Sequence, residues 1–213
     1  MYLSKLLLDP RNRRVQSEIG NRYELHRTLT VQFPEENRKD IDLLYRLELI
    51  NHHRRDEITL FVQTQPQPHW DALSNAGMVT SNPEVKFFEL DFSVGDRFYF
   101  RLLGNPTMRK SQPDGKSKRV GLYTQEEQQA WLSRKARQAG FEVLVVNVRD
   151  FGLIESYKKK NDKTYMIKHL AVQFDGSLKV INPNKFKSAI KNGIGSAKAF
   201  GFGLLSLARK IQG

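Results

Sequence analysis

The chain has 213 residues, of which 39% are hydrophobic, enough for one large or two small folded domains. It contains no cysteine, which excludes disulfides, zinc ribbons, iron–sulfur ligation and a thiol nucleophile, and we expect a cytoplasmic protein. The apolar start is too short for a signal peptide, and no window offers the roughly 20 apolar residues that a membrane-spanning helix needs, so no membrane partner is expected.

The positive charge lies in the second half of the chain. The formal net charge is +12, from 35 Lys and Arg against 23 Asp and Glu. Residues 1–108 carry a net charge of −1 and residues 109–213 a net charge of +13, with no acidic residue after Asp175. Such a field attracts polyanions, so the distribution favours a nucleic acid partner over a surface that is only solvated.

The first half of the chain predicts the order βαββαβ. Apolar residues at helical spacing indicate a long helix that stops before Pro34. Two strands flank a polar loop that contains His52 and His53. This order is that of a ferredoxin-like domain. Strands are expected over residues 2–8, 43–50, 58–64 and 86–90, and helices over residues 14–33 and 70–76.

The second half repeats this order less regularly. Thr124 with Glu127 three residues later predicts a capping box at the start of a helix. The dipeptide Asp175-Gly176 predicts a hairpin turn, and residues 108–119 predict a basic loop. Strands are expected over residues 97–103, 141–148, 163–174, 178–181 and 200–207, and helices over residues 124–139 and, opening at Asn182-Pro183, up to residue 192.

These patterns predict an α+β fold of two tandem ferredoxin-like (RRM-like) βαββαβ domains. The first domain is expected over residues 1–91 and carries the long helix with His26. The second is expected over residues 97–213 and carries the basic residues and a glycine-rich loop. RNA-recognition motifs share this topology, but topology alone does not establish a function.

His26 is the histidine whose neighbours suggest chemistry. Tyr23 precedes it by three residues, so both rings project from one helical face, and Arg22 and Arg27 flank the pair. An imidazole can accept or donate a proton near pH 7, and a phenol can donate a hydrogen bond. Such a group suits a scissile phosphate, although a histidine on a helix is more often a packing residue. The other histidines are expected in a solvated loop (His52, His53), a turn (His69) and a strand (His169).

The sequence contains no metal or cofactor motif. It lacks His-Glu-x-x-His, a calcium loop and a dense acidic cluster, and the glycine-rich segment over residues 191–206 fails the P-loop spacing. A two-metal nuclease needs several convergent carboxylates, which the basic half lacks. If the chain cuts RNA, we expect it to do so without a metal or other cofactor, by attack of the 2′-hydroxyl on the adjacent phosphorus.

The glycine-rich segment is a candidate phosphate contact. Glycines permit positive φ and a close approach of the backbone, and lysines add positive charge. A flexible turn before the last strand is an equally good interpretation. The candidate residues are Lys191, Gly193, Gly195, Lys198, Gly201 and Gly203.

Several stretches resemble one protein family. Residues 193–207 resemble the glycine-rich C-terminal motif of the Cas-six superfamily of CRISPR repeat endoribonucleases. The start of the chain, residues 1–5, is similar to the CasE branch of the type I-E Cascade system, as are residues 23–29, 100–106 and 130–132. The resemblance covers nearly the whole chain in order.

The resemblance implies two ferredoxin-like domains and an endoribonuclease that cuts precursor CRISPR RNA. Members recognise the repeat hairpin, cut on the 3′ side of its stem and keep the product, leaving a 5′-hydroxyl and a 2′,3′-cyclic phosphate or its open form. The family's catalytic histidine and tyrosine match His26 and Tyr23. Some members carry a lysine shortly after the histidine, where this chain has Thr30-Val31-Gln32. The implied partners are the repeat stem-loop and other Cascade subunits.

The basic residues are expected to hold the RNA stem mainly through phosphate and shape contacts, because side chains read the deep major groove of A-form RNA poorly. Two alternatives stay open: a module that binds structured RNA without cutting it, and a structural subunit of a ribonucleoprotein. The expected RNA-binding residues are Arg22, Arg27, Arg109, Lys110, Lys116, Lys118, Arg119, Lys191 and Lys198 and, from the resemblance, Lys158, Lys159 and Lys160.

Overall fold

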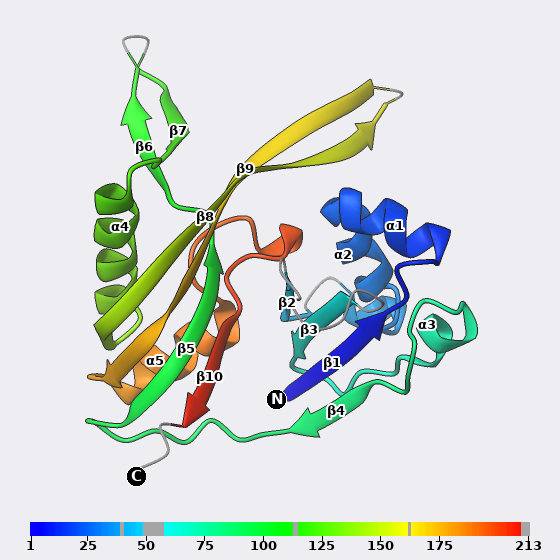
Figure 1. Ribbon diagram of the computed structural model, residues 1–213, viewed down its shortest axis with the longest axis horizontal. Helices are drawn as coiled ribbons and strands as arrows, with labels where there is room; N and C mark the ends of the chain where they lie inside the picture. The colour runs from blue at the N-terminus through cyan, green and yellow to red at the C-terminus, as the bar shows by residue number, and fades with distance from the viewer. Residues whose placement is uncertain (39–40, 49–57, 113–114, 162, 210–213) are drawn as a thin grey trace. The chain divides into compact units, whose positions relative to one another are not determined.

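The computed structural model describes residues 1–38, 41–48, 58–112, 115–161 and 163–209. Within these ranges the strands form two four-stranded antiparallel sheets and one separate two-stranded hairpin (Figure 1). The chain divides into two compact units. No helix in the described ranges is long and apolar enough to cross a membrane. The first unit contains residues 1–90, 155–167 and 198–201, and the second contains residues 91–154, 168–197 and the chain from Phe202 onwards.

The first unit is built around the sheet β2-β3-β1-β4, in which neighbouring strands are antiparallel (Figure 1). The prediction of one helix over residues 14–33 is wrong, because Asn21 leaves the helical conformation with φ −130° and ψ 83°. The elements are β1 (Tyr2–Leu8), α1 (Arg13–Gly20), α2 (Arg22–Thr30), η1 (Glu35–Asn37), β2 (Leu43–Leu47), β3 (Ile58–Thr64), α3 (Asp71–Asn75) and β4 (Glu84–Phe87).

The core of the first unit fixes the orientation of α2. Leu25 and Leu29 on one side of this helix are buried in a cluster with Leu60 of β3. Burial of aliphatic side chains of this size stabilises the fold by roughly 1.5–3 kcal/mol each. Because these leucines hold α2 against the sheet, the part of the helix that carries Tyr23 and His26 stays half-exposed.

The second sheet has the order β10-β5-β9-β8 (Figure 1). Two helices pack on one of its faces: Trp131 of α4 stacks on Phe174 of β9 at 5.8 Å, and Phe186 of α5 meets Phe141 of β8 at 5.6 Å. The predicted capping box at the start of α4 is confirmed. The elements are β5 (Arg97–Gly104), β6 (Thr107–Ser111), β7 (Ser117–Gly121), α4 (Gln125–Gln138), β8 (Phe141–Lys160), β9 (Lys163–Val180), α5 (Pro183–Asn192), η2 (Lys198–Phe200) and β10 (Leu205–Arg209).

The predicted hairpin turn at Asp175-Gly176 is wrong, because β9 runs straight through both residues. Asp175 lies opposite Arg101 of β5 and accepts a hydrogen bond from its Nε at 2.6 Å. A turn conformation occurs instead at Asn161, after the end of β8, where φ is 47°. The pairing with β5 therefore outweighs a local turn preference.

The basic loop predicted over residues 108–119 is also wrong, because most of this stretch forms the hairpin β6–β7. Gly115 has a φ of 75°, and its N–H donates to the carbonyl oxygen of Gln112 at 3.0 Å. From Met108 to Arg119 the described residues are exposed. A hairpin exposed on both faces needs no alternation of apolar and polar residues, which is why the pattern was missed.

The last strand starts later than the predicted residue 200, at Leu205. Gly201 and Gly203 have φ values of 82° and 90°, which are incompatible with a strand. Residues 155–167 and 198–201 pack with the first unit, although they lie within the range 97–213 expected for the second domain. Hydrogen bonds of Asn21 with Tyr157 and of Tyr45 with Ala199 account for this grouping.

We predict that Gly176→Ala destabilises the protein. A Cβ at this position would collide with the backbone carbonyl oxygen of Val145 in β8, and sheet backbone cannot retract as a flexible side chain can. The free energy of unfolding, measured by urea denaturation, is expected to fall by roughly 1–3 kcal/mol. Gly20→Ala is the control, because a Cβ there meets no atom, and it is expected to change stability by less than about 1 kcal/mol. Equal midpoints for both variants would contradict the collision.

Candidate active site

Two side chains of α2 form the centre of the candidate active site. Tyr23 and His26 lie three residues apart, so their rings share one face of the helix, as predicted. Both are half-buried, whereas Leu25 and Leu29 are buried on the core side. The helix thus presents a phenol and an imidazole together at the edge of the core.

The imidazole of His26 lies beside the buried ring of Tyr45, with ring centres 6.3 Å apart. Burial lowers the pKa of His26 below its ordinary value of 6.5, because burial disfavours the charged form. Within the described part of the chain, no hydrogen bond or ion pair engages the imidazole. The ring is therefore neutral near pH 7 and has a nitrogen lone pair that can accept a proton.

The ring of Tyr23 is flanked by two residues that are far away in the sequence. The ammonium nitrogen of Lys158, on β8, lies 5.1 Å from the ring centre, a separation typical of a cation–π contact. The ring of Phe200, in η2, lies 6.1 Å away on a tilted plane. Two other segments of the first unit thus bring the cation of Lys158 and the ring of Phe200 to the helix that carries Tyr23 and His26.

Buried contacts hold the segment 198–201 against α2 and β2. The hydroxyl of Tyr45 donates to the carbonyl oxygen of Arg22 at 2.8 Å and also lies 3.3 Å from that of Ala199. Burial raises the pKa of the Tyr45 hydroxyl, so this group stays protonated as a donor. Gly201 has a φ of 82°, and a Cβ there would lie 2.8 Å from the Tyr45 ring. Only glycine fits this position without displacing Tyr45.

The prediction that Arg22 binds RNA directly is corrected by its position. The side chain is 2% exposed, and Nη1 lies 3.4 Å from the carbonyl oxygen of Phe200. Burial lowers the pKa of Arg22, while the nearby Tyr45 hydroxyl opposes this shift. Arg22 therefore supports the segment that packs on Tyr23 and is not presented to a phosphate.

Asn21 connects the break between α1 and α2 to β8. Its side-chain amide nitrogen donates to the carbonyl oxygen of Tyr157 at 2.9 Å, and its amide oxygen accepts from the Tyr157 N–H at 3.0 Å. The side chain thus pairs with the strand as another backbone would. This contact sets the position of Lys158, the next residue of β8, relative to Tyr23.

The remaining predicted cations belong to several different elements. Arg27 is exposed and pairs with Glu24 at 2.9 Å. Lys158, Lys159 and Lys160 end β8, and the side chains of the last two lie outside what the structure describes. Lys191 is exposed near the end of α5, and Lys198 is half-buried in η2. The other predicted cations are exposed on or beside the hairpin β6–β7: Arg109, Lys110, Lys116, Lys118 and Arg119.

The predicted glycines shape the backbone of the glycine-rich segment. Gly193 ends α5 with a φ of 71°, and Gly195 has a φ of 89° beside Trp131. Gly203 has a φ of 90° and donates its N–H to Leu103. Each of these contacts is intramolecular, so a phosphate contact of the loop stays a prediction.

Of the other histidines, His69 and His169 lie in described residues, and neither belongs to α2. His69 is exposed, and the ring of His169 in β9 packs on Phe202 at 5.7 Å. His52 and His53 lie outside the described residues. In the described ranges, no group of three or more His, Cys, Asp or Glu side chains is placed to hold a metal ion. Cleavage without a metal stays a prediction.

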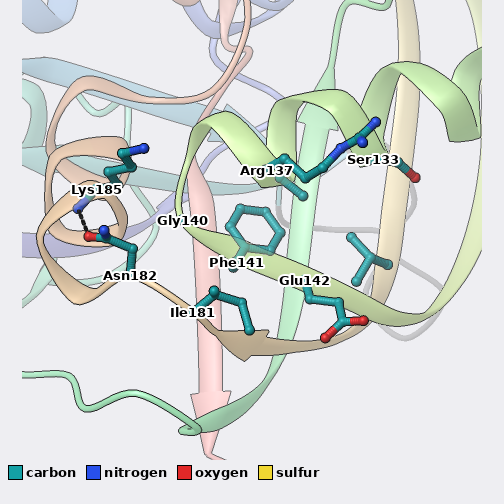
Figure 2. A pocket seen from close by; sticks show the side chains of 10 residues that line it. Ser133, Arg137, Gly140, Phe141, Glu142, Ile181, Asn182 and Lys185 are labelled. Atoms are coloured by element: carbon teal, nitrogen blue, oxygen red, sulfur yellow. Dashed lines mark hydrogen bonds between the residues drawn. The ribbon is translucent and has the colours of Figure 1, made fainter.

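A groove of about 560 Å³ lies in the second unit between the end of α4, the start of β8 and the start of α5 (Figure 2). Arg137, Glu142 and Lys185 border it, and none of the predicted site residues lines it. The candidate active site on α2 and this groove therefore have no residue in common.

Sequence comparison identifies the family of the chain. A profile of the family described as CRISPR associated protein matches residues 1–209. The chain is 33% identical over 219 residues to the CRISPR-associated endoribonuclease Cse3 of Thermus thermophilus, which covers 98% of this chain and 100% of the relative. It is 32% identical over 218 residues to the CRISPR system Cascade subunit CasE of Escherichia coli, which covers 98% of this chain and 99% of the relative. These matches confirm the family resemblance.

The fold is similar to that of a solved relative. A structure of the CRISPR endoribonuclease Cse3 bound to 19 nt RNA aligns with a TM-score of 0.84 at 33% identity, covering 98% of this chain and 100% of that chain. The α+β fold with two four-stranded antiparallel sheets, counted over the described residues, matches it.

We predict that Asn21→Ala loosens β8 at Tyr157. The substitution removes both hydrogen bonds between the side chain and the strand, and each is worth about 1 kcal/mol. Hydrogen exchange of the Tyr157 amide, followed by NMR, is expected to accelerate roughly fivefold or more. Asn192→Ala is the control, since the Asn192 amide contacts only Ser188 within α5. Unchanged protection of Tyr157 in Asn21→Ala would show that the strand is held by other contacts.

Proposed function

Because the chain belongs to the family of CRISPR-associated endoribonucleases that includes Cse3 and CasE, we propose that it binds a CRISPR repeat hairpin and cleaves precursor CRISPR RNA 3′ of the stem. The observation that carries this proposal is the convergence of Tyr23, His26 and Lys158 on one face of α2. A module that only binds RNA has no need of a half-buried neutral imidazole beside a phenol and a cation.

In the proposed reaction, His26 accepts the proton of the 2′-hydroxyl as its oxygen attacks the adjacent phosphorus. The bond from phosphorus to the 5′-oxygen breaks, which leaves a 2′,3′-cyclic phosphate and a 5′-hydroxyl. Tyr23 delivers a proton to the departing oxygen, which therefore leaves as a hydroxyl group and not as an alkoxide. The ammonium group of Lys158 stabilises the charge of the phosphorane.

The reaction is proposed to need neither a metal nor another cofactor. Two-metal cleavage relies on convergent carboxylates, and no such group occurs in the described residues. The 2′-hydroxyl supplies the nucleophile, so the protein needs only to move protons and stabilise negative charge. This mechanism restricts the substrate to RNA.

The hairpin β6–β7 is proposed to hold the RNA stem. Arg109 lies directly opposite Arg119, and Lys110 opposite Lys118. Like charges in directly opposite positions destabilise a sheet, and alternation puts one such pair on each face of the hairpin. Phosphates would relieve this repulsion on both faces, as expected for a hairpin that enters or spans a groove of A-form RNA.

The two four-stranded sheets are proposed to belong to two ferredoxin-like domains, expected over residues 1–91 and 97–213. In support of this, the four strands of each sheet lie in the same spatial order when the hairpin β6–β7 is not counted. In each sheet the fourth strand lies beside the first, the first beside the third, and the third beside the second. Like the Escherichia coli relative, which is a Cascade subunit, the chain is proposed to keep the cleaved RNA and to assemble with other Cascade subunits.

We predict that His26→Ala lowers the single-turnover cleavage rate by about 10²–10⁴-fold and changes RNA affinity little. Tyr23→Phe is expected to lose less, since it keeps the ring. The exposed His69 is the control, and His69→Ala is expected to cleave normally. Since burial lowers the pKa of His26, the wild-type rate is expected to rise with pH up to that pKa and then level off. A loss of less than about fivefold in His26→Ala would exclude it as the main base.

Cleavage is expected to survive EDTA and to stop when the scissile nucleotide carries a 2′-deoxy sugar. Both results follow from attack by the 2′-hydroxyl, which needs no ion and cannot occur without that oxygen. A gel assay with the host repeat RNA and its singly deoxy-substituted copy measures both. Loss of activity on chelation would contradict the proposed mechanism, and so would cutting of the deoxy substrate.

Replacing the four paired hairpin cations with alanine is expected to weaken RNA binding and flatten its salt dependence. Each lost phosphate contact reduces the log–log slope by about 0.7–0.9. The control removes the exposed Arg134 and Arg137 of α4 and is expected to leave the slope unchanged. An unchanged slope in the hairpin variant would mean that β6–β7 is only a solvated surface. The variant combines Arg109→Ala, Lys110→Ala, Lys118→Ala and Arg119→Ala.

A further inference from the structure

The second sheet has a face that α4 and α5 do not cover. Along β5, Phe100 and Leu102 are buried, whereas Tyr99 and Arg101 alternate with them and are accessible. A groove of about 710 Å³ lies on this accessible face, and every residue that lines it belongs to the second unit. The residues that line it include Tyr99, Arg101, Val145, Asp175, Ser177 and Ala208.

Tyr99 lines this groove from β5, an interior strand of the sheet. Its direct neighbours across the sheet are Ala208 of β10 and Ser177 of β9, so its ring rises above small side chains. It is 50% exposed, and among the described residues it has no hydrogen bond or contact with another ring. Tyr99 therefore offers an accessible aromatic surface that the fold itself does not use.

The charges around Tyr99 favour an anion. Arg97 lies directly opposite Lys179, two residues along each strand from Tyr99 and Ser177 and hence on the same face. Like charges in this arrangement cost stability. The acidic side chain that lines the groove, Asp175, accepts hydrogen bonds from Arg101 at 2.6 Å and Gln173 at 2.6 Å. Arg97 and Lys179, which have no ion pair with another described residue, thus lie on the same face as the exposed ring.

We propose that this face binds a single-stranded stretch of RNA, with one base stacked on Tyr99 and neighbouring phosphates beside Arg97 and Lys179. Every base has a π-face, so such a site tolerates sequence variation, and stacking on an aromatic side chain is worth about 1–3 kcal/mol per base. The proposal rests on the proposed function in one respect: the strand bound here is the unpaired flank that adjoins the repeat hairpin. The two neighbouring cations, Arg97 and Lys179, favour a negatively charged RNA strand over an apolar protein segment.

The test compares binding of the repeat hairpin with and without a single-stranded flank of about eight nucleotides. Wild-type protein is expected to bind the flanked RNA more tightly, and Tyr99→Leu is expected to lose about fivefold or more of that gain. Tyr99→Phe keeps the ring and is expected to bind like wild type. Phe87→Leu, which removes a 55% exposed ring from the first sheet, is the control. Matching thermal midpoints show that each variant is folded.

Equal affinity of Tyr99→Leu and wild type for the flanked RNA would overturn the proposal. If this occurs while the hairpin is still bound and cut, the proposed function stands and only the new site fails. If wild type does not recognise the hairpin, the flank alone, with 2-aminopurine as a stacking probe, tests the face independently. Quenching that depends on Tyr99 supports the site, and identical signals for both proteins overturn it. Loss of binding to a Cascade subunit with RNA binding unchanged would assign the face to a protein.

Discussion

The paired hydrogen bonds between the Asn21 side chain and the Tyr157 backbone are the constraint on which the arrangement around Tyr23 depends. An asparagine at this point ends α1, starts α2 and still has a free amide to bind a strand. The backbone of Asn21, with φ −130° and ψ 83°, is outside the helical region, so its side chain does not follow the direction that a continuous helix would give it. The break in the helix is therefore what allows β8 to reach α2, and through β8 the cation of Lys158.

The second support of the site comes from the buried hydroxyl of Tyr45, which meets backbone carbonyls of α2 and of the segment 198–201. Gly201 is required here by its close approach to that ring, so at least one glycine of the glycine-rich segment acts through packing. Tyr23 consequently lies between two fixed neighbours, Lys158 and Phe200. Preorganisation of this kind lets a few side chains act on a large and flexible substrate.

Local signals predicted most of the fold, and long-range pairing decided the exceptions. The capping box at Thr124 and the helix that opens at Asn182 were predictable because their hydrogen bonds close within a few residues. Asp175-Gly176 carries an equally strong local signal, but its pairing with β5 prevails. In the same way, spacing put Tyr23 and His26 on one face, whereas Asn21, Tyr45 and Phe200 could not be found. Their partners lie between 23 and 178 residues away in the chain. Sequence periodicity carries no information about such contacts.

The like-charge pairs connect folding to function. Arg109 with Arg119, Lys110 with Lys118, and Arg97 with Lys179 are each directly opposite on neighbouring strands, where repulsion opposes folding. A sequence selected only for stability would place acids at some of these positions, yet the chain concentrates its acids in the first half. A bound polyanion removes the repulsion only in the folded state, since the unfolded chain does not align these pairs. Polyanion binding and folding would therefore be linked: the like-charge pairs destabilise the folded state of the free protein, and a polyanion bound to them would stabilise it.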